Sequence, residues 1–261
     1  MMEEIEQEIK NIRRYVCIYT RNSTTKWRYY LEEALKYYNA LFDWHSCFYF
    51  GRNEHMGTAE LLQECVIDME CSIFQVTTGS WKPAFFSLRS CLEMGVLLVY
   101  FFVKSSSEDY DKFFEGKKDT PFFTRELVPT IFNAEPFKSY DSAYNLMERI
   151  KQEYWALCDY THTRGWKHFE GHLRGVMEGT KFYTETHPLH AKEIWENWLS
   201  KVKSVYQSLS LLFALATPSF CYILKSEKLP IPPKMNSILT MMDEQDVQQL
   251  TEFIKQHKDL F

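Results

Sequence analysis

Two residues of opposite charge lie within the most apolar stretch of the chain, which runs from Gly79 to Val103 and otherwise carries only Lys82. The spacing of Arg89 and Glu93 places both side chains on one face of a helix. A helix that is apolar on nearly every side is expected to lie between other helices, where each charge must find a partner. Two interpretations follow. The pair neutralises itself and fixes the helix register, or it faces an internal cleft and takes part in binding or chemistry.

A histidine stands where a second predicted helix ends, in the segment Tyr154–Gly165. Histidine titrates near neutral pH, so His162 has the chemistry of a general base that takes a proton from a hydroxyl group. Arg89 would then offer bidentate donors to a phosphate as negative charge develops on it, and Glu93 would orient Arg89. The alternative for His162 is a helix C-terminal cation that interacts with the helix dipole, or a hydrogen-bonded core histidine.

Five of the eight histidines fall between His162 and His190. His168 and His172 have a spacing that can place two imidazoles on one metal ion, but HFEGH is not HExxH and no carboxylate or cysteine completes a site. We therefore expect no metal and no cofactor. The same region is a basic and aromatic segment that suits phosphates and unstacked bases, unless it is simply a solvated loop. Its residues are Arg164, Trp166, Lys167, His168, Phe169, His172 and Arg174.

Composition indicates long helices in one large domain. The chain has 261 residues, with 16% aromatic residues but only nine glycines and nine prolines, which favours helices with few turns. The net charge of −5 gives no global nucleic-acid signal, so any RNA contact must come from a local patch.

The seven cysteines include no CxxC pair, and no secretory leader precedes them. This pattern predicts reduced thiols in a cytoplasmic protein. We expect Cys91 and Cys158 to be small core residues. The uninterrupted apolar run from Met94 to Val103 is well short of the roughly 20 residues that a membrane span needs, so we expect no membrane contact.

Helical periodicity recurs along the chain, and no segment of similar quality alternates with period two. The sequence therefore predicts an all-α helical bundle, with the two long helices after residue 79 at its centre. Residues 1–228 are expected to form a single domain, and residues 229–261 a Pro-rich linker and an amphipathic helix that folds back or contacts a partner. The predicted helices are Met2–Thr20, Trp27–Phe50, Thr58–Thr78, Gly79–Val103, a short charged helix after Ser107, Tyr140–Thr161, Pro188–Ala216 and Asp243–His257.

The stretch SLRSCLEMGVLLVYFF, followed by a helix that ends in a Y..L..Y.H pattern, resembles the HEPN-like superfamily of prokaryotic helical domains. The resemblance implies a four-helix core over about residues 58–225, with additional N- and C-terminal helices. Members are often dimeric, are common in toxin–antitoxin and phage-defence systems, and many are metal-independent ribonucleases. By position, Arg89, Glu93 and His162 would be the functional set, with Tyr160 and Arg164 nearby. The chain departs from the superfamily's ribonuclease signature, an arginine followed four to six residues later by a histidine.

Three hypotheses for function follow. The first is a HEPN-like effector of a toxin–antitoxin or phage-defence system that cleaves RNA without a metal ion. The second is a non-catalytic helical module that binds nucleotide, RNA or a protein partner, and the missing arginine-to-histidine spacing keeps it close to the first. The third is a structural helical protein without a site. The resemblance and the aromatic excess also predict a symmetric homodimer, with a cognate antitoxin or defence-system protein as a further partner.

Overall fold

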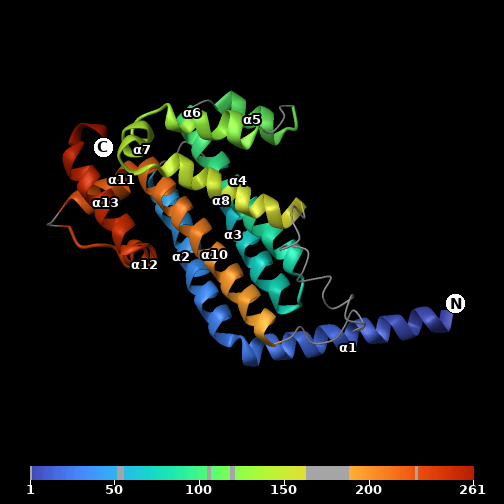
Figure 1. Ribbon diagram of the computed structural model, residues 1–261. Coiled ribbons are helices and arrows are strands. Elements are labelled where there is room, and N and C mark those ends of the chain that lie inside the picture. Colours follow the sequence, from blue (N-terminus) through green and yellow to red (C-terminus); the bar gives the residue numbers. More distant parts are fainter. Residues whose placement is uncertain (1, 52–55, 105–106, 118–120, 163–187, 227–228) are drawn as a thin grey trace.

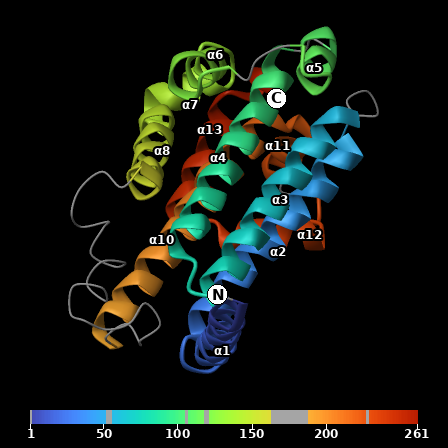
Figure 2. The same ribbon diagram turned by 90° about the vertical axis from the view of Figure 1, so that its right-hand side faces the viewer.

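The computed structural model describes residues 2–51, 56–104, 107–117, 121–162, 188–226 and 229–261. Every regular element in these ranges is helical, so the predicted all-α bundle is confirmed (Figure 1). Four long helices lie side by side in both views (Figure 2). They are α2 (Arg28–Gly51), α3 (Met56–Thr77), α4 (Trp81–Lys104) and α10 (Pro188–Ala216).

Helices α3 and α4 form a tight hairpin because Gly79 takes a left-handed backbone conformation, with φ of 78°, that a residue without Cβ adopts without strain. Further along α4, Gly95 lies against Leu209 of α10, and a Cβ built on Gly95 would lie only 2.3 Å from the Leu209 Cδ2. The absence of a side chain at this position therefore lets α4 and α10 approach closely.

The aromatic excess of the composition goes largely into the core. Trp44, Trp195 and Trp198 are fully buried, and two of the three indole N–H groups find hydroxyl acceptors inside the bundle. Trp44 donates to Ser210 at 3.1 Å and Trp198 donates to Ser72 at 3.0 Å. Buried indoles need such partners, because an unsatisfied donor costs about 1–3 kcal/mol.

The N-terminal helix α1 (Met2–Lys26) is longer than its predicted span. The predicted helix ends at Thr20, whereas α1 continues through Asn22 and Ser23. Thr24 and Thr25 return their hydroxyls to carbonyl groups one turn earlier, Thr24 at 2.9 Å and Thr25 at 2.8 Å, so these residues do not initiate a new helix. The chain bends at Trp27 and enters α2.

Smaller helices follow α4 in the chain and precede α10, and the last of them, α8, packs along α4 and α10 (Figure 1). They are α5 (Ser107–Phe114), the π-helical turn η1 (Phe123–Leu127), α6 (Val128–Phe132), α7 (Phe137–Tyr144) and α8 (Leu146–His162). The predicted single helix Tyr140–Thr161 is wrong at its start, because Asn145 adopts a left-handed conformation with φ of 56° and ends α7. The Asp141 Oδ1 then accepts a hydrogen bond from the Met147 backbone N–H, with the nitrogen 2.6 Å from the oxygen, which supports the start of α8.

The C-terminal segment folds back on the bundle, which is one of the two alternatives left open by the sequence. It comprises α11 (Pro218–Lys225), α12 (Pro233–Met241), α13 (Glu244–Gln256) and the short η2 (Lys258–Leu260). Helix α12 was not predicted. It packs on α2, and α10 side chains bind its backbone carbonyls: the Tyr206 hydroxyl donates to Ile238 at 2.9 Å and the Gln207 amide to Met241 at 2.7 Å.

One helix of the described residues, α4, is long and apolar enough to cross a membrane by length and composition, with a mean hydropathy of 1.6. The kinked pair Lys192–Ala216 and Pro218–Lys225, bent by 89°, passes the same test only if it is counted as a single span. Within α4, 61% of the apolar window is buried inside the bundle, as is usual for a core helix.

Candidate functional site

Arg89 and Glu93 form the predicted ion pair on α4. The Arg89 Nε lies 3.0 Å and its Nη2 lies 2.9 Å from the Glu93 Oε1. The two side chains keep 19% and 28% of their surface exposed, so the pair lies at the edge of the core and not at its centre. Burial alone would lower the pKa of Arg89, but the Glu93 carboxylate outweighs it and raises that pKa above its ordinary value.

Tyr154 of α8 covers the guanidinium. The Arg89 Nη2 donates to the Tyr154 hydroxyl at 3.3 Å, and the guanidinium carbon lies 5.2 Å from the centre of the ring. Phe123 of η1 stacks on the Tyr154 ring, with the two ring centres 4.1 Å apart and the two rings nearly parallel. Burial, followed by the nearby Cys158 and Glu93, raises the pKa of Tyr154 to about 12. The phenol therefore stays protonated at neutral pH.

Cys158 lies one helical turn beyond Tyr154 and is buried. Burial raises the pKa of its thiol, although Arg89 and Tyr154 oppose the change. A thiol that resists ionisation is a poor nucleophile. Cys91 is also fully buried, so the structure agrees with the prediction that both cysteines are core residues.

Acidic side chains also interact where α3 meets α4. On α3, Asp68 is partly buried, and burial raises the pKa of its carboxyl, with further increases from Glu64 and Glu93 and an opposing effect of the Ser90 hydroxyl. Glu64, Asp68 and Glu93 therefore act on one another where α3 meets α4. Of these three carboxylates, Glu93 is the one that contacts Arg89, and its charge weakens the attraction of the guanidinium for an approaching phosphate.

Exposed aromatic side chains lie on the elements that hold Arg89. Phe86 is 58% exposed and precedes Arg89 by one turn of α4, Phe122 is 66% exposed beside η1, and Trp155 is 48% exposed next to Tyr154. Sequence reasoning did not select these residues, because nothing in the sequence indicates which of many aromatic side chains remain outside the core.

Helices α4 and α8 run antiparallel, since Phe85 stacks on Tyr160 with ring centres 4.0 Å apart while Arg89 contacts Tyr154. Tyr160 also accepts a short hydrogen bond from Asn197 of α10, so this predicted nucleic-acid-binding residue is held within the bundle. His162 is the last residue of α8, eight residues or about 12 Å of helix rise beyond Tyr154. The position of its side chain, and hence the predicted contact with Arg89, lies outside the described residues.

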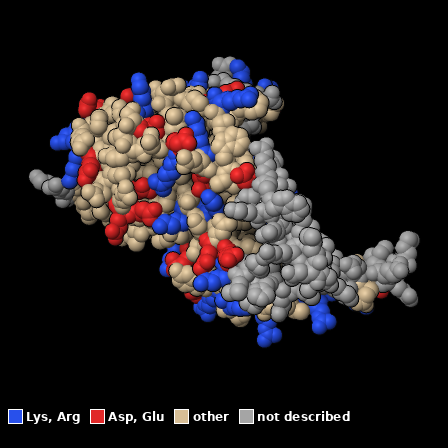
Figure 3. Space-filling view, in the orientation of Figure 1, with Lys and Arg blue, Asp and Glu red and all other residues tan. Residues whose placement is uncertain are grey.

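The rest of the predicted surface also lies outside the described residues. This applies to Arg164, Trp166, Lys167, His168, His172 and Arg174, and with them to the alternative zinc site at His168 and His172. In the described ranges, no group of three or more His, Cys, Asp and Glu side chains is arranged to hold a metal ion. Basic and acidic side chains are intermixed over the described part of the face in Figure 3.

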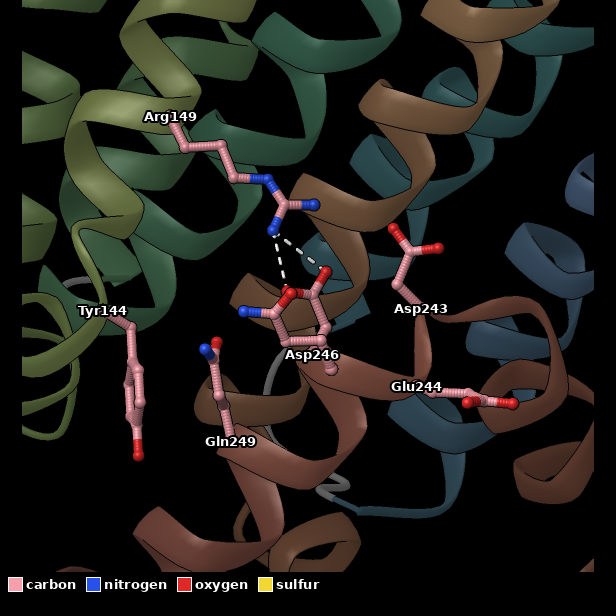
Figure 4. A pocket seen from close by; sticks show the side chains of 7 residues that line it. Tyr144, Arg149, Asp243, Glu244, Asp246 and Gln249 are labelled. Carbon is pink, nitrogen blue, oxygen red and sulfur yellow. Dashed lines mark hydrogen bonds and ion pairs between the residues drawn. The ribbon is translucent and has the colours of Figure 1, made fainter.

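A second site, which the sequence did not predict, lies between α8 and the start of α13. Arg149 donates through Nη1 to both carboxylate oxygens of Asp246, at 2.8 and 2.9 Å, beside a polar pocket of 670 Å³ (Figure 4). Asp246 is buried, and the two residues are 97 positions apart in the chain. No local pattern could have paired them. The pocket is lined by Tyr144, Arg149, Asp243, Glu244, Gln245, Asp246 and Gln249.

Comparison of the chain with protein-family models, with curated proteins and with solved structures finds no match.

Proposed function

We propose that this protein is a HEPN-like cytoplasmic effector of a toxin–antitoxin or phage-defence system that cleaves RNA without a metal ion. The observation that supports the proposal is the placement of Arg89, which is partly exposed at the contact between α4 and α8, on elements that carry exposed Phe86 and Trp155. The helix that covers Arg89 ends at His162.

In this mechanism His162 takes the proton of the RNA 2′-hydroxyl, and the 2′-oxygen attacks the adjacent phosphorus. The bond from phosphorus to the 5′-oxygen breaks, and the leaving oxygen takes a proton from water, so the products are a 2′,3′-cyclic phosphate end and a 5′-hydroxyl end. Arg89 stabilises the charge that develops on the phosphate oxygens, and Glu93 and Tyr154 hold the guanidinium in place. The exposed aromatic rings offer stacking surfaces for unpaired bases. A symmetric homodimer and a cognate antitoxin or defence-system protein belong to the same proposal.

The test is cleavage of a fluorescent single-stranded oligoribonucleotide by the purified chain with EDTA present. We expect cleavage by the wild type, and a loss of roughly 10²-fold or more in His162→Ala and in Arg89→Ala. His45→Ala is the matched control, because His45 is on α2, which supplies none of the described contacts of Arg89, and this variant should cleave like the wild type. Equal cleavage by wild type and His162→Ala would contradict the proposal, and loss of activity on chelation would redirect attention to His168 and His172.

A second candidate function is a non-catalytic helical module that binds a protein partner. It is favoured by the carboxylates Glu64, Asp68 and Glu93, which interact where α3 meets α4. Acidic side chains there oppose an RNA phosphate but suit a basic protein surface. If this candidate is correct, no RNA is cleaved, cellular toxicity is the same for wild type and His162→Ala, and Asp68→Asn weakens capture of the partner protein.

A further inference from the structure

Helix α1 extends away from the four-helix bundle, with the N-terminus at its far end (Figures 1 and 2). Every side chain that is described between Glu6 and Ile18 is exposed. Ile9 is 44% exposed and Val16 is 37% exposed. These two branched side chains are the part of the apolar stripe of α1 that the structure describes, and they offer a contact surface to a partner.

The apolar positions of α1 follow a heptad repeat. Ile5, Ile9, Ile12 and Val16 are separated by four, three and four residues, which is the spacing of the seam in a two-stranded coiled coil. Ser23 continues the same register and is buried at the base of the helix, where α1 joins the bundle. Among the described seam positions, Ile9 and Val16 are therefore exposed, and Ser23 at the anchored end is buried.

The charges of α1 are segregated along its length. Residues 2–9 carry four glutamates and no basic residue, whereas residues 10–26 carry five lysines and arginines and no acidic residue. Two copies of this helix in antiparallel orientation would place the acidic half of each against the basic half of the other. A parallel pair would align like charges, which is unfavourable.

We propose that α1 binds the α1 helix of a second copy of the chain as an antiparallel coiled coil. In the heptad register, position 9 of each copy lies opposite position 12 of the other, and position 16 lies opposite position 5. In this register Glu6 and Arg13, both exposed in the single chain, occupy the positions that flank the seam and pair across it twice. The pairing names the surface of the homodimer proposed above and does not depend on RNA cleavage.

The attachment of α1 to the bundle favours this association, because the seam is short. Isolated helices of about 12–15 residues are marginal in water, but α1 continues into a base that is anchored at Ser23 and is followed directly by α2. Less conformational freedom is therefore lost when the two copies bind than for free peptides.

The first experiment measures the mass of the full chain by sedimentation equilibrium between about 1 and 100 μM. We expect twice the 31.2 kDa chain mass at the upper end and a monomer for Ile9→Glu. Ile18→Glu is the matched control, because Ile18 is equally accessible at 46% exposure but lies off the seam, and it should dimerise like the wild type. A wild-type monomer at 100 μM, or equal dimerisation of Ile9→Glu and wild type, would overturn the proposal.

The second experiment tests orientation by charge exchange. Glu6→Lys alone and Arg13→Glu alone place like charges across the seam and should each raise the dissociation constant about 5-fold or more, whereas the double variant Glu6→Lys/Arg13→Glu should recover the wild-type value. Circular dichroism of each variant verifies that helix content is unchanged. A double variant that dimerises no better than the two single variants would show that these residues do not pair across the seam.

Discussion

Arg89 illustrates at the scale of a residue how a charged group is tolerated beside a core. Its guanidinium meets a carboxylate, a hydroxyl and an aromatic face within one small region of α4 and α8. Each contact compensates part of the lost hydration. The arrangement stabilises the contact of α4 with α8 whether or not the residue also acts on a ligand.

Removal of Arg89 alone should therefore lower the free energy of unfolding more than removal of both Arg89 and Glu93. Arg89→Met leaves the partly buried Glu93 carboxylate without its cation, and we expect a loss of about 1–3 kcal/mol in the free energy of unfolding. The double variant Arg89→Met/Glu93→Leu should be closer to wild type, because no charge is left behind. Urea denaturation measures both values. A double variant less stable than Arg89→Met would show that the apolar replacements do not fit this environment.

Glu153 and Lys201 join α8 to α10 through a more deeply buried pair. The Lys201 Nζ lies 3.2 Å from the Glu153 Oε2, while the Glu153 Oε1 is buried with no hydrogen-bond partner among the described residues. Burial raises the pKa of Glu153, although Lys201 opposes the change. A carboxyl whose pKa is raised by folding binds a proton more tightly in the folded state, so stability falls as pH rises from the unfolded pKa through the folded one.

Lys201→Met should extend the fall in folding stability to higher pH. Without the cation the folded-state pKa of Glu153 rises further, so the variant should lose more stability at pH 8 than at pH 5, by about 1.4 kcal/mol for each pH unit of the added window. Lys192→Met on the same helix is the control, because Lys192 and Glu196 form an exposed pair that contributes little. Urea denaturation at both pH values measures the difference. A penalty for Lys201→Met that does not change with pH would mean that Glu153 does not titrate in this range.

At the scale of elements, the approach of α4 to α10 depends on Gly95. The Leu209 side chain that occupies the space beside this glycine is fully buried, and its Cγ would lie 3.2 Å from an added Cβ. Leu209 therefore has little freedom to move aside. The close contact of α4 with α10 therefore depends on the absence of a side chain at Gly95.

Gly95→Ala should destabilise the protein although alanine is the better helix former. Propensity favours alanine by about 1 kcal/mol, but overpacking of a well-packed core costs about 1–3 kcal/mol, so we expect a lower melting temperature. Shortening the opposing side chain should relieve the clash: Gly95→Ala should cost less in a Leu209→Val background than in the wild type. Equal costs in the two backgrounds would indicate that the alanine is accommodated by a shift of the helices instead.

At the scale of the whole molecule, the C-terminal segment is part of the bundle. Met235 and Ile238 of α12 and Leu250, Phe253 and Ile254 of α13 are all buried, and Arg149 binds Asp246 across the contact of α8 with α13. The Pro-rich stretch from Leu229 to Pro233 therefore connects two parts of one core.

Deletion of residues 229–261 should abolish cooperative folding. Loss of five buried apolar side chains removes about 1.5–3 kcal/mol each, a total that is comparable to the stability of a typical domain, about 5–15 kcal/mol. We expect the truncated chain to lack a thermal transition in calorimetry, and Ile238→Ala in the full chain to lose about 2–5 kcal/mol. A truncated chain with a sharp transition near that of the wild type would show that residues 1–228 fold independently.

The sequence by itself determined the helical class, the positions of most long helices and the pairing of Arg89 with Glu93. These features depend on local periodicity and on i,i+4 spacing, which a single stretch of chain contains in full. It did not determine where helices end when the signal is a single backbone conformation, as at Asn145, or when hydroxyl groups return to their own helix, as at Thr24. The prediction failed at both places, because residue type alone does not distinguish a helix end from a helix interior there.

Only the tertiary structure decided which residues from distant helices meet. It placed Tyr154 over Arg89, brought Asp68 of α3 near Glu93 of α4, joined Arg149 to Asp246 and left Ile9 and Val16 of α1 exposed. The physical reason is that packing selects one arrangement of amphipathic helices among many that satisfy the same periodicity. The partial exposure of Arg89 where α4 meets α8 and the exposure of Ile9 and Val16 on α1 are properties of that arrangement, and they carry the two proposals made for this protein.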